Sequence, residues 1–111
     1  MNANEYQKLA AVTMNKMLDQ RSQILNSALG MCGEAGEFAD LIKKHAFQCH
    51  DLDINHVKKE LGDVCWYVAL ACTVFNLELD DVMQTNIDKL KARYPEGFSA
   101  EKSEHREVGD E

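Results

Sequence analysis

A single proline, Pro95, occurs in this chain of 111 residues, and it comes late. Proline lacks a backbone donor and breaks helix interiors, so its absence before that point permits long helices. Apolar residues recur at helical spacing throughout, and no stretch alternates between apolar and polar residues as a strand would. The sequence therefore predicts an all-α fold, a four-helix bundle with helices over about 4–18, 22–46, 54–75 and 80–93.

Two residues are expected to set the ends of the third predicted helix. Asp53 can cap its amino-terminal end, because an aspartate side chain accepts from the unpaired N–H groups of the first turn. Asn76 can close the other end, because asparagine tolerates the left-handed conformation that often terminates a helix. The connection before this helix is expected over residues 45–53.

The predicted helices form one modest domain over residues 1–98. Hydrophobic residues make up 45% of the chain, which is enough for a packed core. After Glu96 only Phe98 resembles a core residue, so residues 99–111 are expected to form a polar, mobile tail. Four short helices bury limited surface, and the second and third look apolar over a broad arc. We therefore expect a homo-oligomer, either a homodimer or a homotetramer.

The charge and the absence of targeting signals exclude several classes of partner. The formal net charge is −7, which argues against binding a nucleic acid polymer but leaves a nucleotide possible where a metal ion supplies positive charge. No apolar run approaches the roughly 20 residues that span a membrane, and the amino-terminal segment is not a signal peptide. The four cysteines form no CxxC pair. We expect a cytoplasmic protein with reduced cysteines and no membrane contact.

Two pairs of acidic residues are the strongest candidates for a functional site in the sequence. GMCGEAGEFAD holds Glu34 and Glu37, and KKELGDVCWY holds Glu60 and Asp63, each pair at a spacing of three and therefore on one helix face. If the turn centres near His50, Glu37 and Glu60 lie 13 and 10 residues from it, so their heights along an antiparallel hairpin differ by only about 4–5 Å. All four carboxylates can then converge on one point, where a divalent cation would remove their mutual repulsion.

The ligand type predicts which cation this would be. All-oxygen ligands favour a hard ion, Mg²⁺ first and Mn²⁺ next. The glycines of the first motif, Gly30, Gly33 and Gly36, each cost a helix roughly 1 kcal/mol relative to alanine. Without Cβ atoms they would let another helix or a phosphate approach the backbone closely, which would explain their presence.

Three other interpretations of these residues stay open. The acids could form a solvated face, since Lys59 lies four residues before Asp63 and His56 four before Glu60. A di-iron bundle would need Glu-x-x-His motifs, to which the nearest match here starts with an aspartate, Asp53-Ile-Asn-His56. Zinc could bind near the turn, although the spacing there matches no usual zinc pattern; the residues concerned are His45, Cys49, His50 and His56.

Together the acidic motifs resemble those of the MazG-like family of all-α nucleoside triphosphate pyrophosphohydrolases. The family pattern, E-x-x-E, a spacer and then E-x-x-D, matches Glu34-Ala-Gly-Glu37 and Glu60-Leu-Gly-Asp63. The opening NEYQKLA and the later NIDKLKARYPEGF extend the resemblance over about residues 4–98. The short chain is similar to single-domain, phage- or cassette-type members.

The resemblance implies Mg²⁺-dependent hydrolysis of a nucleoside triphosphate between its α and β phosphates, giving the monophosphate and pyrophosphate. Either Glu34 or Glu37 could accept the proton of the attacking water. The resemblance also implies that the last helix meets the triphosphate through Asn86, Lys89 and Arg93. A house-cleaning role against non-standard or excess deoxynucleotides is the biology that the family suggests.

The base is expected to meet aromatic and amide side chains. Tyr67 lies four residues after Asp63 on the same helix face, so it points toward the predicted metal region. Asn26 and Gln23 lie on the approach to that region, which lines the nucleotide pocket in relatives, and Gln7 on the first helix is a further candidate. Each amide could instead be a cap or a surface residue.

Two rival functions remain. One is a catalytically silent helical interaction module that keeps the fold. The other is a pyrophosphohydrolase acting on a phosphoribosyl nucleotide, a reaction that related all-α enzymes perform. The product released from each nucleotide would separate these possibilities from the main prediction.

Overall fold

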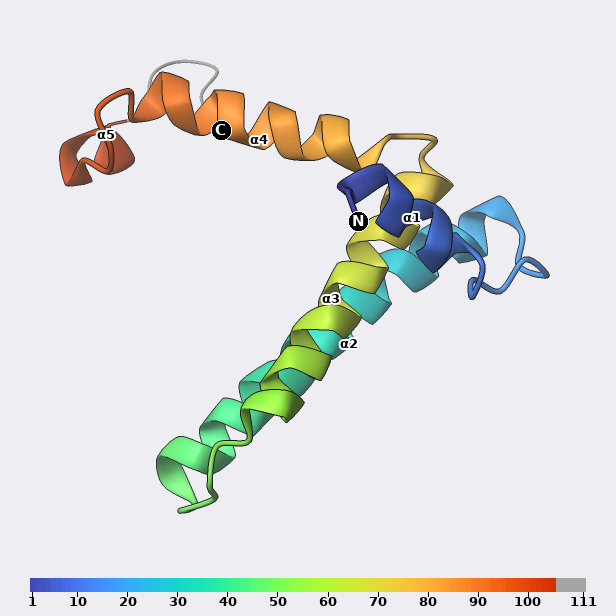
Figure 1. Cartoon of the computed structure of the whole chain (residues 1–111), viewed down its shortest axis with the longest axis horizontal. Coiled ribbons are helices and arrows are strands. Elements are labelled where there is room, and N and C mark those ends of the chain that lie inside the picture. Colours follow the sequence, from blue (N-terminus) through green and yellow to red (C-terminus); the bar gives the residue numbers. More distant parts are fainter. Residues whose placement is uncertain (106–111) are drawn as a thin grey trace. The chain divides into compact units, whose positions relative to one another are not determined.

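The computed structural model describes residues 1–105, which are helical without a β-strand among them (Figure 1). This confirms the predicted all-α class. The helices are α1 (Ala3–Ala11), α2 (Gln20–Phe47), α3 (Ile54–Val74), α4 (Leu79–Arg93) and the short α5 (Ala100–Glu104). The chain divides into two compact units, the first being Met1–Leu79 and the second beginning at Asp80.

Local side-chain chemistry sets the ends of α3 where the sequence predicts them. The Asp53 carboxylate accepts from the backbone N–H of Asn55 at 2.9 Å and caps the first turn. Asn76 has a φ of 57°, in the left-handed region that ends many helices. The backbone N–H of Leu77 then donates to the carbonyl of Cys72 at 2.7 Å, and that of Asn76 donates to Thr73 at 3.1 Å. These two bonds complete a Schellman motif.

The first helix ends at Ala11, so its predicted extension to about residue 18 is wrong. After Ala11 the backbone N–H groups donate to carbonyls three residues earlier rather than four. The Thr13 hydroxyl also donates to the carbonyl of Ala10 at 2.9 Å. Such local side-chain bonds compete with helix continuation. Asp19 then caps α2 by accepting from the Ser22 N–H at 2.7 Å, which starts a new helix direction.

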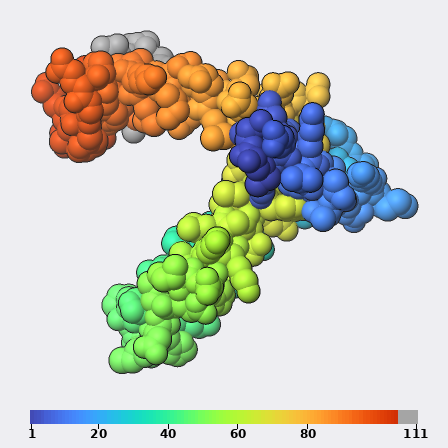
Figure 2. Space-filling model, in the orientation of Figure 1, coloured from blue at the N-terminus to red at the C-terminus, as the bar shows by residue number. Residues whose placement is uncertain are grey.

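Within the first unit, α2 and α3 form a long antiparallel hairpin, and α1 packs against α3 near its carboxyl-terminal end (Figure 1). The core lies at that end, and its residues are mostly small, which lets the three helices approach closely. The buried residues there are Ala10, Ser27, Ala69, Leu70, Cys72, Val74 and Leu79. The far end of the hairpin, drawn green in Figure 2, carries no other helix of this unit on the face shown.

Amide side chains tie the carboxyl-terminal end of α3 to the rest of the unit. The Gln7 amide nitrogen donates to the Leu77 carbonyl at 2.8 Å, and its oxygen accepts from the Leu79 N–H at 2.7 Å. Gln20 donates to the Val74 carbonyl at 2.8 Å, and Gln23 donates to the Leu18 carbonyl at 3.2 Å. Gln7 and Gln23 therefore have partners within the fold, and a contact of either residue with a nucleotide stays a prediction.

Apolar side chains remain uncovered on α2 in the single chain. Leu29 is 69% exposed and Leu25 is 48% exposed, although both lie on the face that the sequence predicts to be apolar. Both leucines lie within two residues of the buried Ser27, so the core covers one face of α2 at this end of the hairpin and leaves another face uncovered.

The second unit begins with most of α4, whose first turn carries Asp80 and Asp81. Acidic residues there complement the positive end of the helix dipole. Past α4, the Tyr94 and Phe98 rings lie 5.4 Å apart, and Gly97 adopts a φ of 94° in the turn between them.

The first part of the predicted tail forms a helix. Ser99 caps α5, with its hydroxyl accepting from the Lys102 N–H at 3.4 Å. The remainder of that tail, residues 106–111, lies outside the described residues.

Within the described residues no single helix is long and apolar enough to cross a membrane; by length and composition alone, only the bent pair α3 and α4 taken together would be.

Candidate metal and substrate site

Three of the four predicted carboxylates come together between α2 and α3. Glu34 on α2 and Glu60 and Asp63 on α3 each offer an oxygen, and these oxygens lie within 4.8 Å of one another. Glu60 and Asp63 share a face because they are three residues apart on one helix, and the antiparallel hairpin brings Glu34 to the same height. Glu34 and Glu60 are partly buried, whereas Asp63 is exposed.

Glu37 lies outside this group of three, although it is close to it. Its side chain is exposed and lines a cavity of about 290 Å³ near the turn of the hairpin, which Glu60 also lines. The other lining residues are Asp40, Leu41, Lys44, His50, Asp51, Asp53 and His56. Glu60 therefore belongs both to the three-carboxylate group and to the cavity.

The carboxylate group carries two signs of unrelieved negative charge. Partial burial, reinforced by the charges of Asp63, Glu60 and Glu37, raises the pKa of Glu34 above its usual value. One oxygen of Glu60, Oε2, is buried and has no hydrogen-bond partner within the described part of the chain. Leaving a buried acceptor without a partner costs free energy, so a ligand that pairs with this oxygen would be favoured.

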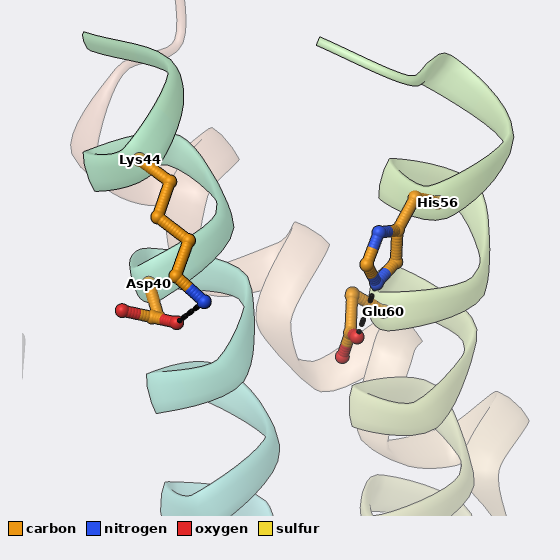
Figure 3. A network of polar contacts seen from close by, with 4 residues as sticks. All are labelled: Asp40, Lys44, His56 and Glu60. Atoms are coloured by element: carbon orange, nitrogen blue, oxygen red, sulfur yellow. Dashed lines mark hydrogen bonds and ion pairs between the residues drawn. The ribbon is translucent and has the colours of Figure 1, made fainter. Parts of the chain in front are cut away.

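An ion pair and a histidine–carboxylate hydrogen bond flank the cavity (Figure 3). On α2, Lys44 Nζ lies 2.9 Å from Asp40, and on α3, His56 Nε2 lies 3.0 Å from Glu60 Oε1. Lys44 and Glu60 both line the cavity, and Figure 3 shows the Glu60 carboxylate on the side of α3 nearer to α2. Lys44 is not among the residues that the sequence predicts for the site, although its seven-residue spacing from Glu37 places it on the same face of α2.

A family model for the MazG nucleotide pyrophosphohydrolase domain matches residues 22–98, which is more than half of the chain. The chain belongs to the MazG family. The matched segment contains all four acidic positions and the whole of α4. The expected resemblance is thereby confirmed.

A phage relative agrees with this membership. The "Gene 37 protein" of Mycobacterium phage L5 is 36% identical over 73 residues, a stretch that covers 62% of this chain and 64% of the relative. The chain thus spans less than two thirds of the length of this curated relative. No solved structure matches the chain.

The alternatives to this MazG site receive different support. A solvated acidic face would pair Asp63 with Lys59 and Glu60 with His56. Within residues 1–105 only the contact between Glu60 and His56 forms. The histidines and the cysteine at the turn do not gather into a metal-binding group there, since the three carboxylates form the only such group in the described residues. Instead, His45 Nδ1 pairs with the His50 carbonyl at 2.9 Å.

The glycines of the first motif play different parts. A Cβ atom at Gly30 would meet the Tyr67 ring at 2.1 Å, so that glycine is what lets the ring lie against α2. Nothing lies within 4 Å of such an atom at Gly33, Gly36 or Gly62. The close approach predicted for the glycines therefore occurs at Gly30, whereas the space next to Gly33, Gly36 and Gly62 is open.

The predicted substrate contacts lie on three helices. Tyr67 is partly buried, and its ring packs edge-on against Trp66 with centroids 4.9 Å apart. Asn26 is exposed on α2. Asn86, Lys89 and Arg93 lie along one face of α4 by their spacing, and the Arg93 guanidinium sits 5.7 Å from the Tyr94 ring centre.

Proposed function

We propose that this chain is a Mg²⁺-dependent hydrolase that converts ribo- or deoxyribonucleoside triphosphates to the monophosphate and pyrophosphate. One observation carries the proposal. In a chain of the MazG family, carboxylates from two helices bring three oxygens within 4.8 Å of one another, and one of these side chains has a buried oxygen without a partner.

The donor set fits a hard divalent ion. Mg²⁺ binds oxygens at about 2.0–2.1 Å in octahedral geometry, so two of its ligands stand about 2.9 Å apart when adjacent and about 4.2 Å apart when opposite. The oxygens of Glu34, Glu60 and Asp63 lie within 4.8 Å of one another, so side-chain rotations would bring them onto one ion. The ion would also relieve the repulsion that, after partial burial, contributes to the raised pKa of Glu34. Mn²⁺ takes the same ligands and should replace Mg²⁺.

The bound ion would offset the negative charge of the phosphates and lower the pKa of a water molecule. We infer that Glu37 would take the proton of that water. Its carboxylate stands outside the group of three, is exposed, and lines the cavity that Glu60 also lines. A carboxylate not engaged by metal can act as a general base. This arrangement favours Glu37 over Glu34 as the base.

The resemblance to the MazG family suggests the substrate contacts. Asn86, Lys89 and Arg93 would meet the triphosphate, with Arg93 suited to a bidentate grip and Lys89 acting as a point charge. Tyr67 and Asn26 would meet the base.

We further propose that copies of the chain associate as a homodimer or homotetramer in the cytoplasm, and that they remove non-standard or excess nucleotides. The exposed leucines of α2, Leu25 and Leu29, supply apolar surface that a second copy would cover. The open space over Gly33 and Gly36 on the same helix would admit a neighbouring backbone. Light scattering of the purified protein measures the oligomeric state, and a monomer would refute this part.

The function is tested by incubating the purified protein with a panel of ribo- and deoxynucleoside triphosphates, with Mg²⁺ and then with EDTA. Pyrophosphate and orthophosphate are quantified separately. We expect Mg²⁺-dependent pyrophosphate, lost in Glu60→Gln and kept in Glu101→Gln, which removes an exposed acid outside the family match. Orthophosphate alone would mean that the wrong bond is cut. No product from any nucleotide would refute the proposal and favour a phosphoribosyl substrate or a silent module.

A further inference from the structure

His56 contacts the carboxylate that links the three-carboxylate group to the cavity. Its Nε2 lies 3.0 Å from Glu60 Oε1, one turn apart on α3 (Figure 3). Glu60 has a side chain only 15% exposed, and its second oxygen, Oε2, is buried without a partner. The two oxygens of this one carboxylate therefore have different surroundings.

The chemistry of the pair determines which atom donates. An ionised carboxylate only accepts hydrogen bonds, so His56 Nε2 must carry the hydrogen and donate it to Oε1. The imidazole thereby occupies Oε1 and restrains rotation of the carboxylate group. Oε2 remains the free acceptor of Glu60, which is the state that a metal ligand requires.

We propose that His56 is a positioning residue for the metal centre: its hydrogen bond holds the Glu60 carboxylate so that the other oxygen is presented to the ion. This inference rests on the proposed function, because it assumes that Glu60 binds the metal. Residues that orient metal ligands through hydrogen bonds typically change metal affinity by about 10–100-fold when they are removed.

A simpler role would be stabilisation of α3, since side chains that pair four residues apart support a helix. The two roles predict different measurements. Helix support alone changes the unfolding temperature and leaves the affinity for metal unaltered. Positioning changes the affinity for metal in protein that is still folded.

The test measures Mn²⁺ binding by electron paramagnetic resonance in nucleotide-free protein. We expect His56→Ala and His56→Asn to bind Mn²⁺ about 10–100-fold more weakly than the wild type, because neither side chain reaches Glu60. His56→Gln should restore binding, since its amide nitrogen can take the place of Nε2. His45→Ala is the matched control, because it removes an exposed histidine that does not line the cavity, and it should bind Mn²⁺ normally.

Thermal unfolding of each variant distinguishes the outcomes. His56→Ala and His56→Asn proteins that fold and bind Mn²⁺ like the wild type would overturn the positioning role and leave the proposed function standing. Wild-type protein that binds no Mn²⁺ would overturn the metal centre, and this inference with it. Weak binding by His56→Gln as well would show that the hydrogen bond is not what matters.

Discussion

Replacing Gly30 with alanine tests the packing of Tyr67 between α2 and α3. The added Cβ would meet Cε1, Cζ and Cδ1 of the ring at 2.1, 2.4 and 2.6 Å. Carbon atoms normally pack at about 3.5–4.0 Å, so the ring must move by more than 1 Å. A rigid aromatic ring cannot do this by a small adjustment, and overpacking of this kind costs about 1–3 kcal/mol.

The opposing effect is the helix propensity of alanine, which favours the variant by about 0.8–1 kcal/mol. Gly33→Ala in the same helix carries that gain with nothing within 4 Å to oppose it. The difference between the two variants therefore isolates the overpacking cost of about 1–3 kcal/mol, with Gly33→Ala the more stable. Gly62→Ala on α3 provides a second open position.

Urea unfolding of the three alanine variants measures this difference. With a slope of about 1–3 kcal/mol per molar for a small protein, the midpoints of Gly30→Ala and Gly33→Ala should differ by roughly 1 M. Adding Tyr67→Ala to Gly30→Ala should recover much of the loss, since the clashing atoms are gone. Equal stability of Gly30→Ala and Gly33→Ala would refute the reasoning. A destabilised Gly33→Ala that also dissociates would instead place a second copy over α2.

Three further predictions concern the site and its support. Glu37→Gln should abolish turnover while the helical circular dichroism spectrum and Mn²⁺ binding persist, because Glu37 stands outside the group of three; retained turnover would contradict its role as base. The raised pKa of Glu34 means that its carboxyl group binds a proton more tightly in the metal-free folded protein than in the unfolded chain. The free energy of unfolding that Glu34 contributes should therefore fall as the pH rises through 4.5 and the range just above it. Urea unfolding across that range should show the decline in the wild type and less of it in Glu34→Gln; identical slopes would contradict the assignment. Gln7→Ala removes the partners of the Leu77 carbonyl and the Leu79 N–H, which should cost about 1–3 kcal/mol in urea unfolding, whereas an unchanged midpoint would show that water replaces both bonds.

Local chemistry explains which features could be predicted from the sequence. The cap at Asp53 and the left-handed residue Asn76 act within a few residues of their own positions, so both ends of α3 were predictable. The spacing of three within each acidic pair also fixes a shared helix face, whatever the rest of the chain does. These features depend on helix geometry alone.

The first helix shows where apolar spacing by itself misleads. That spacing continues past Ala11, yet the helix ends there, where the Thr13 hydroxyl donates to the Ala10 carbonyl, and Asp19 caps a separate helix. Gln7 shows a different limit, since its hydrogen-bond partners lie some 70 residues away in sequence. A residue's own neighbourhood does not reveal a partner at that separation.

Sequence by itself determined the helical class, the ends of α3, the pairing of acids on helix faces and membership of the MazG family. Only the tertiary structure decided that Glu34 joins Glu60 and Asp63 while Glu37 faces the cavity, and that Gly30 differs from the other motif glycines. The physical reason is that periodicity fixes which residues share a face. The rotation and offset of two packed helices, which depend on side chains distant in sequence, decide which of those residues meet.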